Sequence, residues 1–522
     1  MGVERLLPWR RTAPAPPPKP APAKADVCLV LEGTYPFVMG GVSGWIHGLV
    51  RRLPHLRFHL WYIAANQEAA AEEPVYDLPA NVTGMTVVSL EEAADMPRPE
   101  PELLEAWVQS FDRWFGLFTG DEPADFATVV RDMAQRGLGP IATDALIADE
   151  RVWNRLMALY NQEAGQESLL HYFWTCVNSL RPLITLLGTP IPSAGCYHTI
   201  STGYAGLLAA RAHYATGKPT LVTEHGIYTK ERRIEINQAE WIPDRPTARP
   251  RPDRDLPYFR GWWNRVFAGM SKAIYDAADQ ILTIHHGNTA MQIRDGADPR
   301  RMHVIPNGIH VAPIEQAMQQ APPRPAGAPF TVGFIGRIAP IKDVITLIDA
   351  TAVARQWIPD LKVRVMGPSS EDPEYLESCL EHARDLGLDS VLEFEGPVRI
   401  LDVLPQIDVL ILTSVSEAQP LVILEAYAAR LPVISTDVGA ASEMVNGRAG
   451  PDAALGSAGL ITPIGSPVAI AQAMRRLAEN PELRREMGAI GHTRALRFYR
   501  EQRVVDAYGR IYAQALGLED RD

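Results

Sequence analysis

Residues 408–429 read Asp-Val-Leu-Ile-Leu-Thr-Ser-Val-Ser-Glu-Ala-Gln-Pro-Leu-Val-Ile-Leu-Glu-Ala-Tyr-Ala-Ala, an apolar run, a polar loop and a second apolar run. The first run, 408–413, predicts a buried strand of a parallel sheet. Pro420 stands where a proline fits the first turn of a helix, and the segment after it is apolar nearly all round, which predicts a buried helix. The polar loop is therefore expected at the carboxyl end of a parallel strand, where ligands of such sheets bind.

Two carboxylates in this unit carry the functional argument. Glu425 lies inside the predicted buried helix, and burying an ionised carboxylate costs several kcal/mol unless it is partnered. A ligand with two adjacent hydroxyls, such as a ribose, would satisfy it; an ion pair with an arginine or lysine of the chain is the alternative. Glu417 lies in the loop just before the helix, and this placement favours a ligand-binding role for both residues.

Alternation of strands and helices extends from this unit in both directions. Apolar runs predict strands at 27–31, 194–197, 220–223 and 280–284 in the first half, and at 330–335, 362–366, 391–395, 408–413 and 432–435 in the second. Such alternation predicts an α/β protein of two doubly wound, Rossmann-like domains that face each other across a cleft.

The domain boundaries follow from shifts in composition. A Pro-rich stretch at 312–329 predicts the linker, between a first domain at 26–311 and a second at 330–492. We expect a Pro-rich basic arm at 1–25, a helical insertion at about 66–170, and a C-terminal helix at 493–522 that returns to the first domain. Within the insertion, large apolar residues recur every three or four positions over 103–118. They predict a helix whose aromatic face packs in the core, with a membrane or partner surface as the alternative.

Charge and cysteine content exclude several classes of protein. The net charge of the 522 residues is −12, which argues against a nucleic-acid partner. The four cysteines show no CxxC spacing, so free thiols in a reducing compartment are expected rather than a zinc site or a disulfide framework. The sequence has no run of eighteen apolar residues and no apolar signal region in 1–25, so a cytoplasmic protein is expected.

The spacing Glu417-x7-Glu425, followed by Ala-Arg-Leu-Pro-Val-Ile-Ser-Thr at 429–436, resembles the retaining GT-B glycosyltransferases of family 4. The resemblance implies that Glu417 contacts the transferred sugar and that Glu425 binds the ribose hydroxyls of a nucleotide-sugar donor. It also implies donor contacts from Ala418, Gln419, Pro420 and Leu421. Segments 306–309, 439–443 and 459–463 resemble the family's hinge, its Gly-rich turn beside the donor and its closing segment.

A cationic loop opens the second domain, as it does in that family. It reads Gly336-Arg337-Ile338-Ala339-Pro340-Ile341-Lys342 and follows the predicted strand 330–335. A departing diphosphate carries negative charge, and without a metal the protein must neutralise that charge with fixed cations and helix N-termini. Arg337 and Lys342 are therefore assigned to the diphosphate. Together with Glu417, and with His225 of the first domain, they form the predicted catalytic set.

The first domain contributes weaker candidates. Gly40 and Gly41 resemble the family's glycine loop, with Gly41 on the donor side and Gly40 toward the acceptor. His225, in Thr223-Glu224-His225-Gly226, ends a predicted strand, and the resemblance places it against the donor sugar. A strand-end histidine is more often structural than catalytic. His198 ends the neighbouring predicted strand and is a candidate on the acceptor side.

Three further stretches, 31–45, 223–228 and 417–420, are similar to the glycosyltransferases of Pel-type exopolysaccharide and biofilm synthesis. This narrower resemblance implies a UDP-sugar donor, a growing polysaccharide as acceptor, and an inner-membrane synthase and export complex as partner. No metal and no other cofactor is expected. The Asp-x-Asp of the Arg/Pro-rich loop 245–255, Asp253-Arg254-Asp255, is interpreted as part of a mobile loop rather than as a metal site.

Two residues depart from the family pattern. Ala418 stands where glycine is usual, and Arg430 stands where glycine commonly ends the helix. A left-handed backbone at Arg430 would cost about 1–2 kcal/mol. Two alternatives stay open: another sugar-nucleotide enzyme on this fold, such as an epimerase or a phosphorylase, and a non-catalytic nucleotide-binding subunit of a secretion complex.

Overall fold

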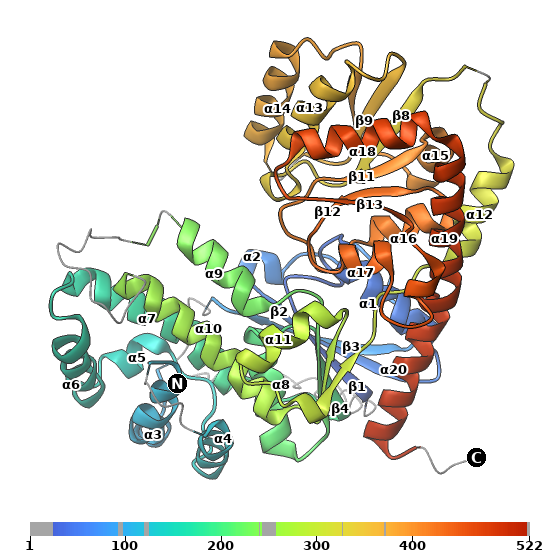
Figure 1. Ribbon diagram of the computed structural model, residues 1–522. Coiled ribbons are helices and arrows are strands. Elements are labelled where there is room, and N and C mark those ends of the chain that lie inside the picture. The colour runs from blue at the N-terminus through green and yellow to red at the C-terminus, as the bar shows by residue number, and fades with distance from the viewer. Residues whose placement is uncertain are drawn as a thin grey trace, which may run out of the picture.

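The computed structural model describes residues 25–91, 98–119, 125–239, 241–242, 257–325, 327–369 and 372–518. The predicted basic arm, apart from Ala25, and the Arg/Pro-rich loop 245–255 lie outside these residues. Within the described residues the strands form two separate parallel sheets, each flanked by helices (Figure 1).

The first sheet has seven strands among the described residues, in the order β3-β2-β1-β4-β5-β6-β7. Their bounds are β1 (Ala25–Glu32), β2 (Phe58–Ala64), β3 (Val82–Ser89), β4 (Ala194–Thr199), β5 (Thr220–Glu224), β6 (Gln280–Thr283) and β7 (Met302–Val304). Alternate residues of β1 enter different cores, since Cys28 and Val30 lie in one cluster while Leu29 and Leu31 lie in another. Both faces of the sheet are therefore covered, which explains why β1 is continuously apolar.

The second sheet has six strands among the described residues, in the order β10-β9-β8-β11-β12-β13. Their bounds are β8 (Phe330–Ile335), β9 (Leu361–Met366), β10 (Leu392–Gly396), β11 (Val409–Leu412), β12 (Val433–Thr436) and β13 (Gly459–Thr462). The strand order reverses direction between β8 and β11, which makes their carboxyl ends the switch point of this sheet. The predicted pair of doubly wound α/β domains is confirmed.

Helices connect the strands and cover both sheets. In the first part of the chain they are α1 (Gly41–Arg52), α2 (Gln67–Ala70), α3 (Pro101–Thr119), α4 (Phe126–Gln135), α5 (Thr143–Ile147), α6 (Glu150–Leu159), α7 (Leu169–Gly188), α8 (Tyr204–Thr216), α9 (Tyr228–Gln238), α10 (Tyr258–Ala277) and α11 (His286–Arg294). Later come α12 (Val311–Gln320), α13 (Val344–Ala354), α14 (Pro373–Asp385), α15 (Ile400–Val403), α16 (Leu421–Ala428), α17 (Ala441–Asn446), α18 (Pro467–Glu479), α19 (Pro481–Phe498) and α20 (Glu501–Leu516). Among the residues that the structure describes, no helix has the length and apolarity to span a bilayer.

The segment predicted as a helical insertion holds α3–α6 but also a strand, β3, that sequence reasoning missed. Most of β3 is half-buried and Val88 is its buried residue, so this edge strand lacks a strong apolar signal. The aromatic face of α3 packs in the core as predicted, with Trp107, Phe111, Trp114 and Phe115 buried. These four side chains therefore form no membrane or partner surface.

The chain crosses between the domains twice, and the two crossings pair with each other. Ile309 and Arg500 form a parallel bridge; the Ile309 amide donates to Tyr499 O at 2.7 Å, and the Glu501 amide donates to Ile309 O at 3.1 Å. A Cβ on Gly308 would lie 2.6 Å from the Cα of Glu501, so the crossing needs a glycine there. We call residues 305–309 with 499–501 the hinge.

Two expectations about these crossings need correction. The single C-terminal crossing helix is two helices, because the chain breaks at the hinge between α19, on the second domain, and α20, on the first (Figure 1). The predicted linker 312–329 is not irregular throughout, because α12 occupies its first part. The prolines that follow α12, at 322, 323, 325 and 329, gave the segment its loop-like composition.

Candidate active site

The predicted motif lies where two neighbouring strands of the second sheet end. β11 is fully buried and leads into the loop 413–420, after which α16 begins at Leu421 with Pro420 as its N-cap residue. β8 leads into a loop that contains Lys342. The Val415 amide donates to Ile341 O at 2.9 Å, and the Thr413 hydroxyl donates to Lys342 O at 2.9 Å. The two loops are therefore held together at the switch point.

Glu417 and Lys342 form an ion pair across these loops. The Ser414 hydroxyl donates to the same Glu417 oxygen at 2.7 Å. The side chains of Lys342 and Glu417 keep 18% and 13% of their exposure, so the pair is shielded yet reachable. Sequence reasoning predicted both charged residues but missed Ser414, because a serine in a polar loop carries no signal of its own.

The residue after Lys342 takes a strained backbone. Asp343 has φ 49°, in the left-handed region, and its carboxylate accepts from the Thr346 amide at 3.3 Å and from the Thr346 hydroxyl at 2.6 Å. Aspartate tolerates this region better than most residues because its side chain can bond locally. Asp343 thereby caps α13 and fixes the direction in which Lys342 leaves the loop.

Glu425 lies on α16, half-buried, and its side chain has no hydrogen bond or ion pair with any residue that the structure describes. Burial raises the pKa of this carboxyl to about 7. The alternative of an ion pair with an arginine or lysine is thus not realised among the described residues. An unpartnered carboxylate here has the capacity to accept hydrogen bonds from a ligand.

A close approach of the Gly-rich turn shapes the Glu417 loop from the other side. The Ala440 amide donates to Ala418 O at 2.7 Å, and a Cβ on Gly439, at φ 52°, would clash with the carbonyl oxygens of Glu417 and Ala418. Ala418 itself has no positive φ, so its Cβ causes no strain. The left-handed position predicted as possible at Arg430 is confirmed, with φ 58°.

Gln419 connects the motif to the hinge. It is 6% exposed, and its side-chain oxygen accepts from the Asn307 amide at 2.7 Å. A contact between Gln419 and the nucleotide sugar would therefore use the backbone or the side-chain nitrogen of Gln419. This contact stays a prediction. The sequence could not predict this hinge contact, because Asn307 and Gln419 are far apart in the chain.

The glycine loop of the first domain reaches the start of α16. Gly40 is the N-cap residue of α1, and a Cβ on Gly41 would lie 3.6 Å from the Leu421 side chain. The predicted residues Gly41 and Leu421 thus meet between the domains, whereas nothing lies within 4 Å of a Cβ built on Gly40. Arg337 is exposed at the end of β8, on the same edge of the second sheet as Lys342.

His225 follows β5 and packs edge-on against Trp45 of α1, with ring centroids 4.7 Å apart. Its Nε2 is buried and has no hydrogen-bond partner among the described residues. Burial lowers the pKa of this imidazole to about 4, so it is neutral at neutral pH. An unpartnered donor or acceptor at a strand end is what the predicted sugar contact requires.

His198 is not an acceptor-side residue, and this prediction is wrong. Its side chain is fully buried, with Nδ1 2.6 Å from the Tyr512 hydroxyl and Nε2 2.8 Å from the Thr223 hydroxyl. Burial lowers its pKa to about 3. Both ring nitrogens are used inside the core, where His198 joins β4 and β5 to α20.

Sequence reasoning also missed the support of the His225 loop. Glu224 is 1% exposed; its carboxylate accepts from Gln292 Nε2 at 2.8 Å, from the Thr202 hydroxyl at 3.2 Å, and from the Tyr275 hydroxyl. Burial raises the pKa of this carboxyl. Glu224 is a positioning residue that anchors the loop next to His225, and its three partners come from distant segments.

No group of three or more His, Cys, Asp or Glu side chains that could hold a metal ion occurs within the described ranges. The four cysteines are buried free thiols. The described part of the site therefore consists of fixed cations, two carboxylates, a neutral imidazole and the glycine loop.

Two parallel-sheet domains with such a site between them define the GT-B class of glycosyltransferase folds. Residues 329–480 match the family model described as glycosyl transferases group 1. Residues 25–300, more than half of the chain, match the model described as a domain of unknown function, DUF3492. The chain belongs to this DUF3492 family and carries a group 1 glycosyltransferase domain, so the prediction of a glycosyltransferase is confirmed at the level of domain family.

Curated relatives agree with the domain assignment. The chain is 32% identical over 244 residues to D-inositol 3-phosphate glycosyltransferase of Kineococcus radiotolerans, covering 43% of this chain and 55% of that protein. It is 25% identical over 334 residues to alpha-maltose-1-phosphate synthase of Mycolicibacterium smegmatis, covering 60% of this chain and 77% of that protein. The chain spans about half the length of the inositol-phosphate glycosyltransferases that it matches.

Solved structures show the same fold over most of the chain. HepE of Anabaena, determined in complex with UDP, aligns with a TM-score of 0.56 at 14% identity, over 94% of this chain and 100% of that chain. Sucrose-phosphate synthase of Thermosynechococcus elongatus aligns with a TM-score of 0.57 at 16% identity, over 94% of this chain and 99% of that chain. The predicted GT-B architecture is confirmed.

Proposed function

We propose that this protein is a retaining, metal-independent glycosyltransferase that moves a sugar from a UDP-sugar to a growing exopolysaccharide. The observation that carries the proposal is the pairing of Glu417 with Lys342 at the switch point, beside the unpartnered carboxylate of Glu425. The UDP complex of HepE, a protein of the same fold, supports UDP as the nucleotide.

In the proposed complex, Glu425 accepts hydrogen bonds from the ribose hydroxyls, which relieves the cost of its burial. The donor diphosphate lies against Lys342 and Arg337, where a point charge and a planar multi-donor group are fixed on braced loops. The amides at the start of α1, which no side chain caps, add partial positive charge. These groups stabilise the charge that develops on the leaving diphosphate.

The acceptor hydroxyl approaches from the first domain, on the face from which the diphosphate leaves. The bond from the anomeric carbon to the phosphate oxygen breaks, the bond to the acceptor oxygen forms, and a phosphate oxygen takes the acceptor proton. Glu417 and the neutral His225 contact the sugar and hold it for this front-side transfer. The anomeric configuration is thereby retained.

The acceptor and the cellular setting are the finer part of the proposal. The resemblance of 31–45, 223–228 and 417–420 is to PelF, the Pel exopolysaccharide glycosyltransferase. It supports a cytoplasmic enzyme that works with an inner-membrane synthase and export complex. The name D-inositol 3-phosphate glycosyltransferase points instead to a small phosphorylated acceptor. A panel of acceptors that contains both inositol phosphate and polysaccharide separates the two classes.

The nucleotide is tested by thermal unfolding with UDP, GDP or ADP in the presence of EDTA. A ligand at 100 times its dissociation constant adds about 2.7 kcal/mol of stability. We expect UDP to stabilise the wild type and the control Glu482→Ala, whose side chain is 93% exposed, but not Glu425→Ala. The absence of stabilisation by any of the three nucleotides would contradict the proposal.

A further inference from the structure

A hollow of about 390 Å³ opens between the two domains beside the hinge. The first domain contributes His285, which follows β6, and the neighbouring residues 304–306. The face of α20 contributes Arg503 and Arg510, and the second domain contributes Arg448. Gln419 stands at its border with the Glu417 loop, so the hollow adjoins the predicted donor site without including Glu417, Glu425 or Lys342.

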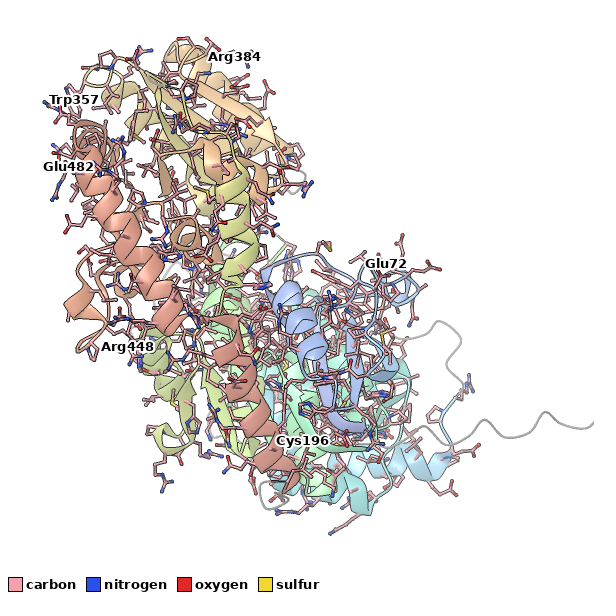
Figure 2. All side chains as sticks on the ribbon, turned by 90° about the vertical axis from the view of Figure 1, so that its right-hand side faces the viewer. Glu72, Cys196, Trp357, Arg384, Arg448 and Glu482 are labelled. Carbon is pink, nitrogen blue, oxygen red and sulfur yellow. The ribbon has the colours of Figure 1, made fainter. Side chains whose placement is uncertain are left out.

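A second, open hollow of about 950 Å³ continues from it along α20 toward Gln514. The two share Val304, Ile305, Arg448, Ala507 and Arg510. We call the two together the hinge-side hollow. Figure 2 shows Arg448 beside the junction of α19 and α20, at the level where the domains meet. The first hollow alone has the size of a site for a small ligand.

The hinge-side hollow has an excess of positive charge, because each of its acidic lining residues is already paired with an arginine. Its two acidic residues are held by arginines: Glu443 lies 3.3 Å from Arg448, and Asp452 lies 2.6 Å from the buried Arg494. Arg510 is exposed and has no hydrogen bond or ion pair with any described residue. Since the whole chain carries a net charge of −12, a basic hollow between its domains attracts an anion against the overall field.

A buried histidine in the wall lacks a partner. His285 is 4% exposed; its Nδ1 accepts from the Gly287 amide at 3.1 Å, while its Nε2 has no partner among the described residues. Burial lowers the pKa of His285 to about 4, so the ring is neutral and its proton is on Nε2. Buried donors are rarely left unsatisfied, and an anion in the hollow would supply the acceptor that this one lacks.

We propose that the hinge-side hollow binds a small phosphate-bearing anion, held by Arg503, Arg510 and Arg448 and by a hydrogen bond from His285 Nε2. Arginine forks suit phosphate oxygens, and a neutral imidazole adds a directed donor. Arg448 belongs to the second domain, whereas Arg510 lies on a helix packed on the first. The bound phosphate therefore joins the domains and favours the closed arrangement in which the walls meet.

The test is equilibrium dialysis with inorganic pyrophosphate at fixed ionic strength, with UDP saturating the donor site. We expect one pyrophosphate site per chain in the wild type and in the control double variant Arg384→Gln/Arg485→Gln. Both control arginines are exposed in the second domain, away from the hollow. In Arg503→Gln/Arg510→Gln the affinity falls at least about tenfold, while UDP binds as in the wild type.

A second variant separates a lost donor from a lost fold. His285→Asn keeps a side-chain acceptor for the Gly287 amide at the start of α11 and removes the Nε2–H donor; we expect weaker pyrophosphate binding with an unchanged circular dichroism spectrum. If pyrophosphate does not bind once UDP is present, or binds equally to the arginine double variant and its control, the inference is wrong. Should UDP itself fail to bind, the same titration is run without UDP on the wild type, the arginine double variant and Lys342→Gln. Pyrophosphate binding that survives in Lys342→Gln but weakens in the arginine double variant supports the hinge-side hollow, and the opposite pattern overturns it.

Discussion

Single side chains show most clearly what a sequence can reveal about function here. Glu425 could be proposed because a carboxylate inside an apolar helix is costly and so conspicuous, whereas the roles predicted for Glu417, Lys342 and His225 rested on their place after strands and on the resemblance to family 4. His198 has the same sequence context as His225 and proved structural, because its partner Tyr512 comes from the far end of the chain. Sequence spacing carries no information on such a contact.

The raised pKa of Glu425 makes stability depend on pH. The folded state holds the protonated form up to about pH 7, whereas the unfolded carboxyl ionises near 4.5, so Glu425 costs stability increasingly as pH rises between these values. We expect Glu425→Gln to be more stable than the wild type by about 1–2 kcal/mol at pH 8 and equal to it at pH 4.5. Urea unfolding at both pH values measures this. A constant difference across the range would show that Glu425 is not desolvated.

Truncation of His198 is expected to lower stability but not transfer, and truncation of His225 is expected to lower transfer with little effect on stability. His198→Ala leaves the Tyr512 hydroxyl without a partner in the core, while the Thr223 hydroxyl keeps that of Tyr508 at 3.0 Å; the substitution should lower the free energy of unfolding by about 2–3 kcal/mol. The transfer rate per folded molecule should be nearly unchanged. His225→Ala should instead reduce transfer at least about tenfold with less than about 1 kcal/mol lost. The reverse pattern would reassign the sugar contact to His198.

At the scale of elements, the sequence predicted nine of the thirteen described strands; it missed the buried strand β2, the half-buried strand β3 and the short strands β7 and β13. β11 and β8 are continuous apolar runs, and they place the Glu417 and Lys342 loops side by side. β3 was missed because it is a half-buried edge strand, and the break between α19 and α20 was missed because it depends on the hinge bridge. The Gly-rich turn was predicted as a motif, but its contact with the Glu417 loop is visible only in three dimensions.

Gly439 tests how tightly that turn supports the site. A Cβ there would clash with the carbonyls of Glu417 and Ala418, so Gly439→Ala should displace the Glu417 loop and lower transfer by about two orders of magnitude. Gly465 is the matched control, since its φ is 63° but nothing lies within 4 Å of a Cβ. Gly465→Ala should cost about 1 kcal/mol of stability and leave transfer intact. Equal effects of both substitutions on transfer would contradict a supporting role for the turn.

At the scale of the whole molecule, the two domains are joined by paired chain crossings and by one side chain of the motif itself. The Gln419 side chain accepts a hydrogen bond from the backbone amide of Asn307, so the Glu417 loop and the hinge form one connected unit. Sequence patterns predicted both segments and two domains facing a cleft, but not this connection, which depends on residues more than a hundred positions apart. Coupling of donor binding to domain arrangement is the expected consequence.

Gln419→Ala tests that coupling. The substitution leaves a buried amide unsatisfied and should cost about 1–3 kcal/mol. We expect small-angle scattering to show a more open average shape without ligand, and the KM for the donor to rise more than kcat falls. Gln502→Ala, an exposed glutamine on α20 near the hinge, is the control. An unchanged shape and KM would place Gln419 outside the hinge.

The central claim, that Glu417 and Lys342 form the transfer site, is tested most directly by UDP release from UDP-sugars with a polysaccharide acceptor and EDTA. The wild type should turn over one of the UDP-sugars, and Glu417→Gln should lose at least about a hundredfold in kcat while binding UDP with the wild-type affinity. Product of the same anomeric configuration as the donor completes the expected result. Undiminished turnover in Glu417→Gln, or none by the wild type with any UDP-sugar, would contradict the account.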